Sequence, residues 1–141
     1  MIIKLATEPQ EIIDHLRIRE IVFIDGQNVP YDLEHDGLDS VSTLIIVYDN
    51  EKPIGAGRYR FVDDYIKIER IAVLEEYRGK GIGKDIMDFL ENQVIENTSI
   101  RKLVLNSQCS AQIFYEKLGY EPIGDIFMEA DIQHVKMIKY L

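Results

Sequence analysis

The chain has 141 residues, 46% of them hydrophobic and 29% charged, and its formal net charge is −9. This length and balance predict a single domain over residues 1–141 with a sizeable core, and the acidic charge argues against a nucleic-acid partner. No run approaches the ~18 apolar residues of a membrane helix, and the start of the chain shows no signal-peptide pattern. The lone Cys109 cannot form an internal disulfide, so we expect a cytoplasmic protein without a membrane partner.

The first half of the chain predicts a short strand, a helix, a loop and three further strands. Thr7 and Gln10 fit a capping box, and apolar residues at helical spacing then predict a helix to about Asp25. Residues 25–40 hold five acids and no lysine or arginine, which predicts a loop with one short helical turn. Strands over 43–49, 54–62 and 65–74 are separated by tight turns, which favours an antiparallel meander.

The second half alternates helices and strands. Apolar periodicity predicts a helix over about 81–96, a buried strand over 102–106 and a second helix around 111–118. Two more strands are expected near 121–123 and 135–140. The order β-α-β-β-β-α-β-α-β-β indicates an α/β (α+β) protein with a mixed, mostly antiparallel sheet flanked by helices.

The stretch YRGKGIGKD (residues 77–85) places three glycines and three cations at the start of a predicted helix. A Walker loop is excluded because Arg78 and Asp85 stand where glycine and Ser or Thr are needed. A dinucleotide fingerprint is excluded because Lys84 and Ile86 occupy the positions of its third glycine. What remains is a loop of free N–H groups suited to an anion such as a pyrophosphate, or else a plain turn with surface lysines.

Two motifs resemble those of the GNAT acetyltransferase superfamily. Arg78-x-x-Gly81-x-Gly83, preceded by IAVLEEY, matches its R/Q-x-x-G-x-G/A signature, and FYEKLGY (residues 114–120) is similar to its second hallmark. VFIDGQNVP, EHDGLD and HVKM further resemble a bacterial subgroup of small, uncharacterised GNAT proteins. The resemblance covers most of the chain, because the order of predicted elements also fits.

The resemblance implies that the anion is the pyrophosphate of acetyl-CoA, used as a co-substrate without a metal. The pantetheine arm would run along Ile71, Ala72 and Val73, and the N–H of Val73 would polarise the thioester oxygen. Gln108 would bind pantetheine or cap a helix, and Phe114 is assigned to the same cofactor site. The residues expected to hold the pyrophosphate are those of the loop: Arg78, Gly79, Lys80, Gly81, Ile82, Gly83 and Lys84.

Acetyl transfer to an amine needs a base for the amine and benefits from an acid for the departing thiolate. Glu69 is the candidate base, because it precedes the cofactor turn on one strand face; the alternative is a carboxylate paired with Lys67 or Arg70. Tyr115 is the candidate acid, since the family often places a tyrosine there; the alternative is a core residue with its hydroxyl at the boundary.

The acceptor site is predicted from charged residues elsewhere in the chain. Glu34 and Asp36, with Asp39 nearby, would attract a cationic amine, unless they form a merely solvated acidic loop. Arg58 and Arg60 would bind an acceptor carboxylate, or else pair with Asp63 or Asp64. The subgroup resemblance places His134 at the acceptor site, although a lone histidine is more often structural.

The sequence thus predicts an acetyl-CoA-dependent N-acetyltransferase that acts by direct attack in a ternary complex. Its acceptor is expected to be a primary amine of a small metabolite: an amino acid, a polyamine or an aminosugar. Two alternatives remain, a non-catalytic acyl-CoA sensor and a protein lysine or N-terminal acetyltransferase. A homodimer is compatible with the fold, but no interface is indicated.

Overall fold

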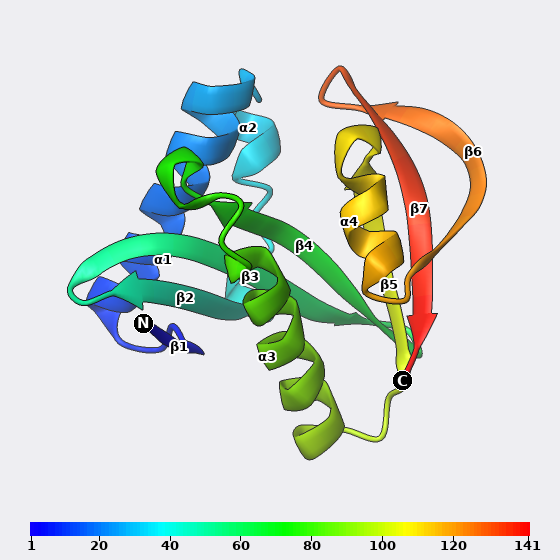
Figure 1. Cartoon of the computed structure of the whole chain (residues 1–141), viewed down its shortest axis with the longest axis horizontal. Helices are drawn as coiled ribbons and strands as arrows, with labels where there is room; N and C mark the ends of the chain where they lie inside the picture. Colours follow the sequence, from blue (N-terminus) through cyan, green and yellow to red (C-terminus); the bar gives the residue numbers. More distant parts are fainter.

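A computed structural model of all 141 residues contains a seven-stranded sheet in the order β1-β2-β3-β4-β5-β7-β6 (Figure 1). This confirms the predicted mixed, mostly antiparallel sheet and the predicted order of helices and strands. The strands are β1 (Ile2–Leu5), β2 (Thr43–Asp49), β3 (Lys52–Val62), β4 (Tyr65–Val73), β5 (Lys102–Gln108), β6 (Glu121–Glu129) and β7 (Ile132–Tyr140). The α-helices are α1 (Pro9–Arg19), α2 (Tyr31–Glu34), α3 (Ile82–Asn97) and α4 (Gln112–Lys117).

The only parallel pairing in the sheet is between β4 and β5, and it is short. Strands β1 to β4 form an antiparallel series, as do β5, β7 and β6. The β4–β5 ladder runs only from Ile66↔Leu103 to Ile68↔Leu105. Beyond Ile68 the two strands diverge, which Figure 1 shows as β4 and β5 separating from a common end near the C terminus. The sheet therefore opens in its middle.

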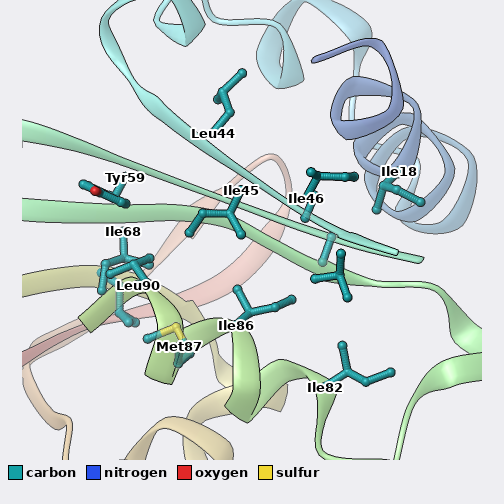
Figure 2. Close-up of a cluster of buried hydrophobic side chains, with 14 of the residues drawn as sticks. Ile18, Leu44, Ile45, Ile46, Tyr59, Ile68, Ile82, Ile86, Met87 and Leu90 are labelled. Atoms are coloured by element: carbon teal, nitrogen blue, oxygen red, sulfur yellow. The ribbon is translucent and has the colours of Figure 1, made fainter. Parts of the chain in front are cut away.

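The hydrophobic core lies on both faces of the sheet. Figure 2 shows Ile82, Ile86 and Leu90 of α3 pointing at the sheet, with Ile18 of α1 on the opposite side. These four side chains are at most 2% exposed, and burying each contributes about 1.5–3 kcal/mol. Both helices are therefore fixed by packing, and the start of α3 is held at the open end of β4.

The N-terminal helix corrects two details of the sequence prediction. The capping box is formed by Glu8 and Glu11, one residue later than the predicted pair Thr7 and Gln10. The α-helix ends at Arg19, and the chain continues as a π-helix, η1 (Glu20–Asp25), which reaches the predicted end at Asp25. Single-turn π-helices commonly occur at functional sites, and this one faces the opening between β4 and β5.

The longest helix, α3, has 16 residues, and none of the helices combines the length and apolarity needed to cross a membrane.

Candidate active site

The opening between β4 and β5 forms a cavity of about 790 Å³. Its floor is β4 from Lys67 to Val73, one wall is the end of β5, and the other is the segment from η1 to α2. The turn between β6 and β7 closes part of the remaining side. This volume lies within the range of pockets that bind small molecules. The cavity is half apolar, since 14 of its 28 lining residues are hydrophobic.

A β-bulge shapes the floor of the cavity. In the β3–β4 ladder, Arg58 pairs with Glu69 and Ala56 with Ala72, so Arg70 and Ile71 together oppose Gly57. Arg70 has a φ of 60°, in the left-handed region, which costs a residue with a side chain on the order of 1–2 kcal/mol. The bulge bends β4 away from β5, which explains why the parallel ladder stops at Ile68.

The bulge also determines where the backbone N–H of Val73 points. Leu74 donates its N–H to the carbonyl of Ile54 on β3, at 2.9 Å. Successive residues of a strand direct their N–H groups to opposite sides, so the N–H of Val73 points toward β5, into the opening. Val73 lines the cavity, and its N–H is therefore placed to polarise a carbonyl oxygen bound there.

The glycine loop lies at the end of β4 and leads into α3. Gly79 and Gly81 have φ of 76° and 82°, and a Cβ built on either would meet nothing within 4 Å. These glycines are thus required by the backbone conformation rather than by crowding. Gly81 is the left-handed N-cap of α3, so the unpaired N–H groups of the first helical turn follow it directly. The loop fits an anionic group such as a pyrophosphate.

Gly83 has a different reason to be glycine. A Cβ at this position would lie 3.1 Å from Cζ of Phe114, so the α4 side chain packs directly against the first turn of α3. Phe114 is thus a support behind the loop and does not line the cavity. Ile82 is 2% exposed and its side chain belongs to the core, so only the backbone of this residue is available to a cofactor.

The three cations of the loop are held in different ways. Arg78 lines the cavity and donates from Nε to the carbonyl of Val73 at 3.0 Å, which ties the loop to the end of β4. The Lys80 ammonium lies 5.2 Å from the ring centre of Tyr77. Lys84 pairs with Asp88 one turn along α3, at 2.7 Å. All three are exposed, but only Arg78 lines the cavity.

Tyr115 and Gln108 lie on the β5 wall of the cavity. Burial raises the pKa of Tyr115 far above its usual value of 10.0 and is the single cause of the shift. The phenol is therefore protonated at neutral pH, as a proton donor must be. Gln108 exchanges hydrogen bonds with Gln27, at 2.8 Å and 3.4 Å, and makes no side-chain cap for the following helical turn. The helix-capping alternative for Gln108 is therefore wrong.

Glu69 lines the cavity as a paired carboxylate. It accepts hydrogen bonds from Nε of Arg60 at 2.7 Å and Nη2 of Arg58 at 3.0 Å, while Nζ of Lys67 is 3.9 Å away. Burial alone would raise the pKa of Glu69, but the hydrogen bond from Arg60 and the charge of Arg58 hold it below its usual value. The alternative of a paired carboxylate is thus realised: Lys67, one of the expected partners, lies at ion-pair distance, and Arg58 and Arg60 make the hydrogen bonds.

Three acids of the acidic loop, Glu34, Asp36 and Asp39, are paired with arginines. Glu34 is 1% exposed and pairs with Arg19 at 2.7 Å and Arg70 at 2.8 Å. Asp36 pairs with Arg58 at 2.8 Å. Burial would raise the pKa of Asp36, but the hydrogen bond from Arg58 lowers it below its ordinary range. The prediction that Glu34 and Asp36 bind a cationic amine is therefore corrected: both lie at the cavity, but their charges are already compensated.

Arg58 requires a further correction. It is completely buried and pairs with Asp36, Asp39 and Glu69, at 2.8 to 3.0 Å. It does not line the cavity, so it cannot bind an acceptor carboxylate as predicted, nor does it pair with Asp63 or Asp64. Arg60, which was predicted to share this role with Arg58, does line the cavity.

His15 anchors the same network from α1. Its Nδ1 donates to the carbonyl of Ile45 at 2.8 Å, and its Nε2 accepts from Nη1 of Arg19 at 3.2 Å. Burial, opposed by the hydrogen bond to Ile45 but assisted by the charge of Arg19, lowers the pKa of His15 from 6.5 to about 4. The ring is therefore neutral in the folded protein at neutral pH.

His134 lines the cavity from β7, opposite β4. It is 7% exposed and its Nδ1 donates to the carbonyl of Ile132 at 2.7 Å. This contact leaves Nε2 for the cavity, where the Glu129 carboxylate lies 3.5 Å away. His134 also stacks on Phe127, with ring centres 5.9 Å apart. His134 thus lies at the cavity, and its contact with an acceptor stays a prediction.

Several lining residues carried no signal of their own in the sequence. Gln27 follows η1 and Glu129 ends β6, and the place of both segments beside the cavity depends on the tertiary fold. Lys67 shares the strand face of Glu69, and that alternation could have marked it as a site residue. Arg70 occupies a bulge with a positive φ, which nothing in the local sequence indicates.

The opened strand pair, the inward N–H of Val73 and the glycine loop at the start of α3 follow one another along the chain, an arrangement suited to an extended ligand with an anionic end. Residues 15–141 match the acetyltransferase (GNAT) domain family. The protein YjcF of Bacillus subtilis (strain 168), named an uncharacterized N-acetyltransferase, is 41% identical over 136 residues, covering 96% of both chains.

Solved structures share the fold. An acyl-CoA N-acyltransferase from Pseudomonas aeruginosa superposes with a TM-score of 0.85 at 23% identity, covering 98% of this chain and 97% of that one. An aminoglycoside 6′-N-acetyltransferase complexed with coenzyme A has a TM-score of 0.78 at 15% identity, covering 99% and 97%. The chain belongs to the GNAT acetyltransferase family, whose members transfer an acyl group from an acyl-CoA to an amine.

Proposed function

We propose that this protein is an acetyl-CoA-dependent N-acetyltransferase that acts on a primary amine of a small metabolite by direct attack. The observation that carries the proposal is that Val73, Tyr115 and Glu69 all line one cavity. One cavity with one carbonyl-polarising N–H suits two substrates bound together.

The co-substrate would lie along β4 and the glycine loop. The N–H groups and the positive end of α3 would hold the pyrophosphate, with Arg78 and Lys80 adding charge. The backbone of Ile71 and Val73 would hold the pantetheine arm. Gln108, which is hydrogen-bonded to Gln27, would meet the same arm from β5.

The transfer forms a C–N bond and breaks the C–S bond, so the nitrogen must lose a proton and the thiolate must gain one. Tyr115 supplies the proton to the departing sulfur. Glu69 receives the amine's proton through water and passes it on to bulk water, because its lowered pKa makes it a short-lived acceptor. His134 contacts the acceptor amine from the opposite wall through Nε2. Each of these roles is a feature of the proposal.

The test is release of the CoA thiol from acetyl-CoA across a panel of amino acids, polyamines, aminosugars and short peptides. Turnover of one class of small amine is the expected result. Tyr115→Phe should lower kcat by about 10- to 100-fold while leaving CoA binding unchanged, because the ring stays in place. Glu69→Gln should lower kcat and flatten the acidic side of the pH–rate profile.

Two results would contradict the proposal. Binding of CoA without turnover of any acceptor would favour a sensor, and turnover confined to peptides would favour a protein acetyltransferase. Full activity in Tyr115→Phe would remove the assigned acid.

A further inference from the structure

The β3–β4 side of the cavity, beside Glu69, exposes two cations. Arg60 of β3 and Lys67 of β4 are direct cross-strand partners, so their side chains leave the sheet on the same face. Both line the cavity. They are 20% and 25% exposed, against 11% for Glu69. In a protein with a net charge of −9, this part of the cavity therefore presents positive charge.

The neighbouring carboxylates do not cancel this charge. The buried network holds four arginines against four carboxylates, which leaves the Lys67 ammonium in excess. The members of the network are Arg19, Arg58, Arg60 and Arg70 with Glu34, Asp36, Asp39 and Glu69.

Both cations also have donors to spare. Arg60 uses only Nε on Glu69, at 2.7 Å, which leaves its two terminal nitrogens for a ligand. Nζ of Lys67 is 3.9 Å from the nearest carboxylate oxygen of Glu69, beyond hydrogen-bond distance. A guanidinium edge beside an ammonium is a favourable arrangement for a carboxylate or phosphate oxygen pair.

The wall formed by the segment from η1 to α2 gives the rest of the ligand an apolar surface. Val22 and Phe23 of η1, with Val29 and Leu33 near α2, line the same cavity. Nη2 of Arg70 donates to the carbonyl of Leu33 at 3.2 Å, which holds this wall against β4. A ligand here would meet cations on one side and hydrocarbon on the other.

We infer that the acceptor is a small amine that also carries an anionic group, a carboxylate or a phosphate, bound by Arg60 and Lys67. Glu69, between these cations and the N–H of Val73, then faces the amine while the anionic group is held by its neighbours. This inference rests on the proposed function and names the substrate class for the same site.

The experiment compares paired acceptors that differ in the anionic group alone. Leucine is measured against leucinamide, and phosphoethanolamine against ethanolamine, by release of the CoA thiol from acetyl-CoA. The expected result is a kcat/KM at least about tenfold higher for the anionic member of one pair, equivalent to one charge-assisted contact. A preference within the leucine pair indicates a carboxylate, and a preference within the phosphoethanolamine pair indicates a phosphate. The α-amino group of leucinamide is less basic than that of leucine, so more of it is neutral and able to attack. Intrinsic reactivity would therefore favour leucinamide and cannot produce the expected preference for leucine.

Variants connect the preference to the two cations. Lys67→Gln should raise KM for the anionic acceptor about tenfold and reduce the preference toward one, with little change in kcat. Arg60→Gln should have the same effect. Lys67→Gln separates anion binding from the positioning of Glu69 more cleanly, because Lys67 makes no hydrogen bond to Glu69. Lys52→Gln is the matched control, since Lys52 is an exposed lysine paired with Glu76 outside the cavity, and should leave the ratio unchanged.

A binding measurement gives a readout without turnover. Calorimetric titration of the CoA-saturated protein with N-acetyl-leucine and N-acetyl-leucinamide should show tighter binding of the anionic product, lost in Lys67→Gln. A preference for the uncharged members in both assays, or an unchanged preference in Lys67→Gln, would overturn the inference. Failure of the proposed function is distinguishable, because then no acceptor of either kind would release CoA.

Discussion

The two ends of the cavity are built in different ways. At the outer end, Val73 and Arg78 lead to the glycine loop, whose residues Gly79 to Gly83 lie outside the cavity lining. This region is made of backbone: N–H directions, left-handed glycines and a helix start. The inner end, around Glu69, is made of side chains that reach it from α1, α2, β3 and β4 and pair with one another. The comparison shows why one end has a local sequence signature and the other does not.

The difference also concerns stability. Glycines 79 and 81 are exposed and have open space around them, so the loop can be altered at little cost to the core. The inner end contains buried charges, and a buried ion that loses its partner is destabilising by about 3–5 kcal/mol. Substitutions at the inner end should therefore affect folding first, and those at the outer end should affect binding first.

The largest effect is expected at Arg58. Arg58→Met leaves Asp36, Asp39 and Glu69 without their shared partner, so the free energy of unfolding should fall by about 3 kcal/mol or more. Urea denaturation followed by circular dichroism measures it. Lys52→Met, which removes an exposed pair, should change it by less than about 0.5 kcal/mol. Equal stability of the two variants would show that the network does not hold the inner end together.

The next effect is the pH dependence of stability through His15. The unfolded ring titrates near 6.5 and the folded ring near 4, so the unfolded state binds more protons between these values. The contribution of His15 is thus fully present above pH 6.5 and is lost as the pH falls toward 4, up to on the order of 3 kcal/mol. Denaturant midpoints at several pH values measure the slope.

His15→Gln is the control for this pH dependence, since an amide does not titrate. The stability of the variant should fall less between pH 6.5 and pH 4 than that of the wild type. If both proteins lose stability with the same slope, the neutral buried His15 is not the cause.

The smallest effect on folding, with a clear effect on binding, is expected at Gly81. Its φ of 82° makes Gly81→Ala cost about 1 kcal/mol, and the altered loop should weaken CoA binding about tenfold, equivalent to about 1.4 kcal/mol. Gly124→Ala is the matched control, because Gly124 has a φ of 76° with open space around it but lies on β6. Equal CoA affinity in the two variants, by calorimetry, would argue against the loop as the pyrophosphate site.

Much of the fold and half of the site could be predicted because they depend on local chemistry. Apolar spacing gave α3 and its buried face, and the glycine pattern at 79–83 marked the loop. The alternation along β4 placed Glu69 and Lys67 on one face. These signals lie within a few residues of one another and require no knowledge of tertiary contacts.

The remainder depends on pairing between distant segments. Arg58 looked like an acceptor ligand because its strand face was known but its partners, 19 and 22 residues away, were not. The acidic loop was predicted to be free of partners, because nothing in the sequence indicates that distant arginines fold against it. The pairing of Gln27 with Gln108, 81 residues apart, likewise follows from the topology of the sheet alone.

The central claim is that acyl donor and amine meet in one cavity beside Val73, Glu69 and Tyr115. Initial rates of CoA release, with acetyl-CoA and the preferred acceptor varied together, test it most directly. The account predicts intersecting double-reciprocal lines, and no acetylated protein by mass spectrometry when acetyl-CoA is added without acceptor. Parallel lines, together with a stoichiometric acetyl-enzyme, would contradict it.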